Sequence, residues 1–209
     1  MKQILITLFV ILCMNQSMQA QTWNGSVSNI WTNPLNWTPN SVPIATSNIT
    51  LNGAGFSPKL QANTSVGAIA NATGATLDFN GFSLTVGGIN AYTNILGATL
   101  INTNVSTDIV LNINTGSAGY NSQINNCIIN DHITVNLTGS NAFYEGTAAN
   151  TFNGNVAMNI SGSSTVYLSN TAASQYNGNF NFNRTVAGSS YLFNQGGTVT
   201  GNVNIQNTG

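Results

Sequence analysis

The chain has very few charged side chains. Only 3% of its 209 residues are charged, and the net charge is −1, whereas a typical globular chain has about 25% charged residues. A nucleic-acid-binding face needs clustered Lys and Arg, but Lys59 and Arg184 are the only basic residues beyond residue 20. We therefore expect no nucleic-acid partner, and the solubility of the protein must come from Asn, Ser and Thr.

Long apolar runs are also scarce. The run from Ile4 to Cys13 follows Lys2, and it is shorter than the roughly 20 residues that cross a bilayer. A basic start, a short apolar stretch and a plausible cleavage site after Ala20 are typical of a secretory signal peptide. The sequence thus predicts that residues 1–20 are a signal peptide and that the chain has no membrane span. A lipoprotein signal acylated at Cys13 is the alternative.

Cysteine is equally rare, since removal of residues 1–20 leaves Cys127 alone. No intramolecular disulfide is then possible. A reactive thiol needs a basic neighbour or a helix N-terminus to lower its pKa, and the residues around Cys127 provide neither. We expect a buried structural cysteine.

Motifs of several enzyme classes are missing from the sequence. It contains no G-x-S-x-G, H-E-x-x-H, paired C-x-x-C, Walker loop or G-G-x-G-x-D nonapeptide. These absences argue against a serine hydrolase, a zinc site, a nucleotide site and a calcium-binding nonapeptide repeat. No cofactor and no metal are expected from motifs.

The chain does have a pattern that returns every 23 or 24 residues. Apolar residues alternate with polar ones in five segments, namely Ile109-Leu111-Ile113, Ile133-Val135-Leu137, Val156-Met158-Ile160, Phe180-Phe182 and Val203-Ile205. Other positions keep the same step, namely Tyr144, Tyr167 and Tyr191; Phe152, Tyr176 and Val199; and Gly-Ala-Thr-Leu at 74–77 and 97–100. A fixed period in this range is the signature of a solenoid.

The alternation within each copy predicts half-buried strands. About 23 residues with two or three short strands close one turn of a parallel β-helix, with coils about 4.8 Å apart. We predict an all-β, single-stranded, right-handed parallel β-helix over residues 53–209, with about six coils from Val66 onward. The chain stops inside a repeat at Gly209, so we expect a fragment or a missing terminal cap. A Greek-key sandwich is the alternative, but it does not explain aromatic columns in one phase.

One column precedes each repeat strand and reads Asp108, His132, Asn155, Asn179 and Asn202. Identical amides can hydrogen-bond along a stack of strands. The last three members therefore predict a short asparagine ladder at a corner.

All three tryptophans, Trp23, Trp31 and Trp37, lie in one short segment outside the repeat. The end of a solenoid exposes apolar surface and unpaired strand edges, which a large aromatic segment can cover. We predict that residues 21–52 form an N-terminal cap with the first strands. The alternative is that the three rings form a glycan-binding platform.

The pattern W-x-G-x5-W-x4-N-W-x4-V-P spans Trp23 to Pro43 and is followed by the Gly-Ala-Thr-Leu strands. It resembles the start of secreted bacterial β-helix surface proteins, the autotransporter passengers and adhesin-like proteins of Gram-negative bacteria. The resemblance implies a rod at the outer surface of a Gram-negative cell, used in attachment or as a stalk. Such proteins contact extracellular glycans or other cell-surface components, which are the partners we expect.

The best candidates for chemistry are Asp108, Asp131 and His132. Counting from the Gly-Ser corners places Asp131 over Asp108, whereas counting from the apolar strands places His132 over Asp108. We prefer the strand register, because core side chains cannot change phase without turning to solvent. Neighbouring carboxylates could act in glycoside hydrolysis or bind a cation. They could equally cap strand entries through Asx turns.

These observations favour a non-enzymatic, secreted or cell-surface solenoid that serves in adhesion or as a structural stalk of a larger surface protein. The alternative function is a polysaccharide lyase or glycoside hydrolase that uses Asp108, Asp131 and His132.

Overall fold

The structure is a computed structural model that describes residues 20–88, 91–104, 106–116 and 121–209. Nearly all of the predicted signal peptide lies outside these residues. In the described part the chain is built of β-strands, together with one 3-10 helix, η1 (Pro34–Asn36). The all-β prediction is therefore confirmed.

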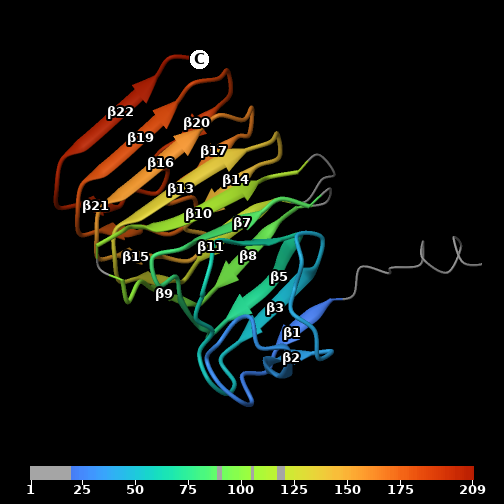
Figure 1. The fold of residues 1–209 in the computed structure, drawn as a ribbon. Helices are drawn as coiled ribbons and strands as arrows, with labels where there is room; N and C mark the ends of the chain where they lie inside the picture. Colours follow the sequence, from blue (N-terminus) through green and yellow to red (C-terminus); the bar gives the residue numbers. More distant parts are fainter. Residues whose placement is uncertain (1–19, 89–90, 105, 117–120) are drawn as a thin grey trace, which may run out of the picture.

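Three sheets surround one core, and from residue 64 onward the chain passes through all three in turn (Figure 1). One coil contains β10 (Ile109–Asn114), β11 (Ser122–Asn125) and β12 (Ile128–Ile129), after which β13 (Ile133–Thr138) lies parallel beside β10. Since each strand pairs with its equivalent in the next coil, the chain forms a parallel β-solenoid, as predicted.

Sheet I has seven strands, in the order β22 (Val203–Asn207), β19 (Phe180–Arg184), β16 (Val156–Ile160), β13, β10, β7 (Ser83–Val86) and β4 (Thr64–Val66). Sheet II has nine, in the order β2 (Trp37–Thr38), β1 (Gln21–Trp23), β3 (Asn48–Asn52), β5 (Ala68–Thr73), β8 (Thr93–Leu96), β11, β14 (Phe143–Glu145), β17 (Val166–Tyr167) and β20 (Ser190–Tyr191). Sheet III has six, in the order β21 (Thr198–Val199), β18 (Gln175–Tyr176), β15 (Thr151–Phe152), β12, β9 (Thr99–Ile101) and β6 (Thr76–Asp78).

The register of the sheets follows the period of the sequence. In sheet I the residues level with one another are Ile109, Ile133, Val156, Phe180 and Val203. In sheet III the two Gly-Ala-Thr-Leu copies place Leu77 beside Leu100. The alternating apolar residues of the repeat, which begin at Ile109 in β10, Ile133 in β13, Val156 in β16 and Phe180 in β19, point into the core and are buried. The apolar side chains of successive coils thus stack on one another inside one continuous core.

Aromatic rings stack directly on their equivalents. The rings of Tyr144, Tyr167 and Tyr191 follow one another at 4.8 Å between centroids, with interplanar angles of 3° and 5°. Phe152 and Tyr176 stack in the same way at 4.9 Å. These spacings match the distance between neighbouring strands, so the aromatic columns predicted from the sequence are confirmed.

Asparagines also form ladders, of two kinds. On the outer face of sheet I, Asn136 Nδ2 donates to Asn112 Oδ1 at 2.8 Å, and Asn159 Nδ2 donates to Asn136 Oδ1 at 2.9 Å. At the corner where we predicted a ladder, the side chains instead bond to the backbone. Asn155 Oδ1 accepts from the Asn179 N–H, and Asn179 Oδ1 accepts from the Asn202 N–H. Amide side chains therefore join coils both along a face and at a corner.

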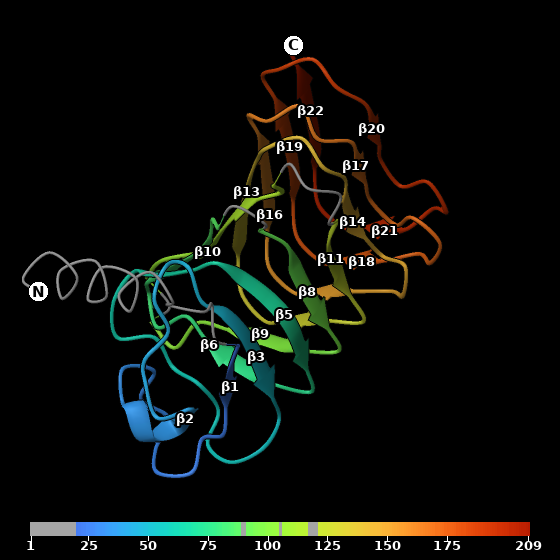
Figure 2. The ribbon, with the colours of Figure 1, turned by 90° about the vertical axis from the view of Figure 1, so that its right-hand side faces the viewer.

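The tryptophan segment lies at the N-terminal end of the coil stack, opposite β22 (Figure 2). Trp23, Trp31 and Trp37 are at most 1% exposed, and their ring centroids are 4.8 to 6.2 Å apart. β1 pairs antiparallel with β2 and parallel with β3. The segment thus covers the first coil both with its rings and with an antiparallel strand.

The three indoles differ in their hydrogen bonds, and this difference gives a test of the cap. Trp37 Nε1 donates to the Trp31 carbonyl at 2.8 Å, whereas Trp31 Nε1 is buried without a partner. We expect Trp37→Phe to lower the free energy of unfolding by about 1–3 kcal/mol more than Trp31→Phe does, because only the former leaves a buried acceptor unpaired. Guanidinium unfolding of both variants measures the difference. Equal losses would show that this hydrogen bond does not stabilise the cap.

Candidate functional site

The structure settles the register of the predicted acidic cluster. Ile109 pairs with Ile133, so Asp108 is level with His132, and Asp131 precedes that level by one residue. The strand-based register is therefore confirmed, and the corner-based one is wrong at this position. All three residues lie at the entry to sheet I, where the chain turns into β10 and β13.

Two of these side chains make hydrogen bonds to the backbone at the strand entries. Asp131 Oδ1 accepts from the His132 N–H at 2.8 Å, and His132 Nδ1 accepts from the Asn155 N–H at 2.9 Å. Because Nδ1 accepts, a neutral His132 carries its proton on Nε2. His132 thus occupies the position in its coil that Asn155 and Asn179 occupy in theirs, and it serves the same linking role.

The chemistry open to this cluster is limited. Asp108 and His132 are exposed, and no group of three His, Cys, Asp or Glu side chains in the described ranges is placed to hold a metal ion. A glycosidase also needs a cleft that positions the sugar between its carboxyl groups. What the geometry supports for Asp131 and His132 is the capping of strand entries.

The tryptophans predicted as a possible glycan platform have no open ring face. Trp23 and Trp37 are fully buried, and Trp31 is 1% exposed. Stacking on a sugar requires an accessible ring face, so this burial favours the cap over the glycan platform.

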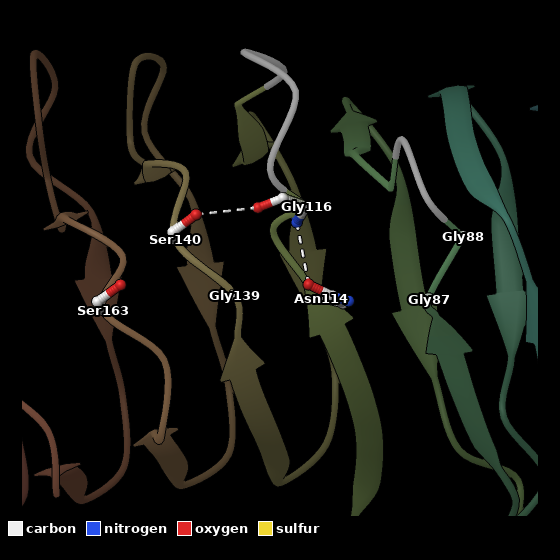
Figure 3. Close-up of a pocket in the computed structure, with 7 residues that line it drawn as sticks. All are labelled: Gly87, Gly88, Asn114, Gly116, Gly139, Ser140 and Ser163. Carbon is white, nitrogen blue, oxygen red and sulfur yellow. Dashed lines mark hydrogen bonds between the residues drawn. The ribbon is translucent and has the colours of Figure 1, made fainter.

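A shallow hollow of about 600 Å³ lies across successive corners between sheets I and II. Its lining residues are Gly87, Gly88, Asn114, Gly116, Gly139, Ser140 and Ser163, which lie in a row from coil to coil (Figure 3). We call it the corner groove. Ser140 Oγ donates to the Gly116 carbonyl at 3.3 Å, and Asn114 Oδ1 accepts from the Gly116 N–H at 3.0 Å. The lining has no charged side chain, and its polar side chains are those of Asn114, Ser140 and Ser163.

Sequence reasoning missed a buried carboxylate. Glu145 at the end of β14 is 2% exposed. Its Oε1 accepts from Asn150 Nδ2 and Ser174 Oγ, both at 2.5 Å. Its Oε2 accepts from the Ser169 N–H at 2.8 Å and from the Tyr176 hydroxyl at 2.7 Å. Four donors replace the water that the ionised group loses on burial, so the network joins two coils without a cation.

A signal for this carboxylate does exist in the sequence. Phe143 and Glu145 are two residues apart in one strand, so they point to the same face, and Phe143 is an obvious core residue. Three of the four donors, Asn150, Ser169 and Ser174, could not be identified in the same way, because they lie in corners that carry no apolar pattern.

Cys127 is buried, as predicted, and its thiol lies 3.1 Å from the Asn125 carbonyl. Burial raises the pKa of the Cys127 thiol above its ordinary value of 9.0. A neutral thiol is a poor nucleophile, so its position indicates a structural residue.

Comparison with known proteins adds no assignment. No family model, no curated protein and no solved structure matches the chain. In the described part, no helix is long and apolar enough to cross a membrane.

The Glu145 network predicts a loss of stability at high pH. Burial, together with the charge of Glu145 and the hydrogen bond to it, raises the pKa of Tyr176 well above 10.0. The folded state therefore keeps this proton after unfolded chains have lost it, and the stabilisation is complete below pH 10 and declines as the pH rises further. We expect the wild-type free energy of unfolding to fall by up to about 1.4 kcal/mol more per pH unit above pH 10 than that of Tyr176→Phe.

Tyr176→Phe is a suitable comparison because Phe152 already places a phenyl ring in the same column. At pH 7 this variant is expected to lose about 1–3 kcal/mol, since Glu145 loses one donor. Urea unfolding at a series of pH values measures both effects. Parallel curves for the two proteins above pH 10 would mean that Tyr176 is not the group responsible.

Proposed function

We propose that the chain is a non-enzymatic β-solenoid module of a secreted or cell-surface protein and that it serves as a structural stalk. The observation that carries this proposal is that side chains outside the core also join one coil to the next. The Asn112-Asn136-Asn159 ladder and the Tyr144-Tyr167-Tyr191 stack both lie on outer faces of sheets. A stalk must hold together along its long axis, and these columns join each coil to the next along that axis.

The two ends of the coil stack differ in how much of the core is covered. The tryptophan cap closes the N-terminal end. At the other end, Val203 and Ile205 of β22 are 50% and 51% exposed, although their equivalents Phe180 and Phe182 are buried.

The expected location rests on the sequence. The basic and apolar start of the chain is typical of a signal peptide, and the Trp23–Pro43 pattern resembles that of bacterial surface solenoids. Both features support a location outside the cytoplasm. Adhesion is the second candidate function, and the observation that favours it is the uncharged corner groove, whose hydroxyl, amide and backbone groups could bind a glycan.

The polysaccharide lyase or hydrolase is the less favoured alternative. The structure commits Asp131 and His132 to backbone hydrogen bonds at strand entries, and the corner groove is lined by residues other than these. Turnover of a uronate or neutral polysaccharide by the folded protein, abolished by Asp131→Asn, would reverse this assignment.

The stalk proposal predicts resistance to force along the coil axis. When the chain is pulled from its two ends by atomic force microscopy, we expect it to unfold in discrete steps, each releasing one or more coils. A coil of 23 residues spans at most about 80 Å when extended, so the steps should be multiples of that length. A flexible Gly/Ser linker of equal length is the control, because it extends without steps. A smooth extension like that of the linker would contradict the proposal.

A further inference from the structure

The sequence contains five Asn-Gly pairs, which begin at Asn24, Asn52, Asn80, Asn153 and Asn177. An asparagine before glycine can modify itself, because the glycine nitrogen can attack the side-chain carbonyl carbon and glycine has no side chain to hinder the approach. The reaction needs an unbonded glycine N–H and an amide side chain that can turn toward it. The hydrogen bonds of the folded chain therefore decide which pair reacts.

Two of the pairs are blocked at the attacking nitrogen. The Gly81 N–H donates to Asn102 Oδ1 at 2.6 Å. The Gly25 N–H donates to the Asn36 carbonyl at 3.3 Å. In the other three pairs, the glycine N–H has no partner among the residues that the structure describes. These pairs begin at Asn52, Asn153 and Asn177.

Asn153 and Asn177 occupy equivalent positions in successive coils, at the corner that leads into sheet I. They belong to a further amide ladder, in which Asn177 Nδ2 donates to Asn153 Oδ1 at 3.0 Å and Asn153 Nδ2 donates to Asn130 Oδ1 at 2.8 Å. Thr200 takes the next position, but its Oγ1 donates to the Tyr176 carbonyl at 3.5 Å. Asn177 is therefore the end of the ladder, and within the described chain its Oδ1 accepts no hydrogen bond.

This end position gives the Asn177 amide more freedom than the other two candidates have. Asn153 is held at both ends of its amide, and Asn52 Oδ1 accepts from the Ala54 N–H at 3.3 Å. A side chain that turns toward the glycine nitrogen must break its hydrogen bonds, and each one slows the reaction by about two- to tenfold. Asn153 and Asn177 form a matched pair, because each lies in the sequence aromatic-Asn-Gly-Asn.

We propose that Asn177 is a self-modification site, at which the Gly178 nitrogen attacks Cγ. A C–N bond forms, the bond from Cγ to Nδ2 breaks, and the proton of the glycine nitrogen leaves with Nδ2 as ammonia. The resulting succinimide is opened by water at either carbonyl, which gives aspartate or isoaspartate. The next coil covers this corner, since the Gly201 N–H donates to the Gly178 carbonyl at 3.2 Å.

The product weakens the link between two coils. A carboxylate has no N–H, so the hydrogen bond to Asn153 Oδ1 is lost and two oxygen atoms face each other. Isoaspartate also lengthens the backbone between β18 and β19, where Phe180 must stay level with Val156. The modification thus loosens the coil of Asn177 from the coil before it. This chemistry goes beyond the stalk role and does not depend on it.

The test is prolonged incubation of the full chain in mildly alkaline buffer, with peptide mapping by mass spectrometry over time. Conversion is measured by the mass gained when an amide becomes a carboxyl group, and isoaspartate by its enzymatic methylation. We expect Asn177 to convert about two- to tenfold faster than Asn153, and Asn80 to stay largely unmodified because the N–H that follows it is bonded. In denaturant, Asn153 and Asn177 should convert at similar rates, since the residues around them match.

Asn177→Thr makes the test specific, because Thr200 already places a threonine in this column. The variant removes the site and also the donor to Asn153 Oδ1. Asn153 then becomes the end of the ladder, and its conversion should become about two- to tenfold faster. Asn52→Thr is the control and should leave the rate at Asn153 unchanged. Conversion of Asn153 as fast as that of Asn177 in the folded wild type, an intact Asn177, or an unchanged rate at Asn153 in Asn177→Thr would overturn the proposal.

Discussion

The repeated parallel register is the constraint on which the rest of the structure depends. Each side chain has its equivalent about 4.8 Å away in the next coil, so a column can be filled only by groups that tolerate close contact with their own kind. Aliphatic groups, aromatic rings and amides do so, as the Tyr144-Tyr167-Tyr191 and Asn112-Asn136-Asn159 columns show. Like charges at this distance repel one another. The low charge of the chain therefore follows from its architecture.

The few charged residues are exceptions to this stacking, and three of them, Asp78, Glu145 and Arg184, are buried. Glu145 is surrounded by four donors from its own and the next coil, which makes it part of the structural framework. Arg184 makes three hydrogen bonds, and among the described residues its Nη1 has no partner.

The sequence was sufficient to predict the solenoid, its register and the burial of Cys127, because these follow from a period that repeats along the chain. The Trp23, Trp31 and Trp37 cap could be inferred from the need to cover an open end. The environments of Glu145 and Arg184 could not be predicted, because their partners lie across corners whose backbone path the period does not define. The positions of Asn155, Asn179 and Asn202 in one corner column were predicted correctly. Their side-chain bonds to backbone N–H groups were not, because these bonds also depend on the backbone path at the corner.

Residue-resolved amide hydrogen exchange of the folded chain tests the repeated register most directly. Backbone amides in paired central strands exchange only when the coil stack opens. We predict slow exchange over residues 109–114, 133–138, 156–160 and 180–184, so that protection recurs at the 23- or 24-residue step of the strand pairing. Protection that lacks this recurrence, as in a sandwich of antiparallel strands, would contradict the stacked-coil account.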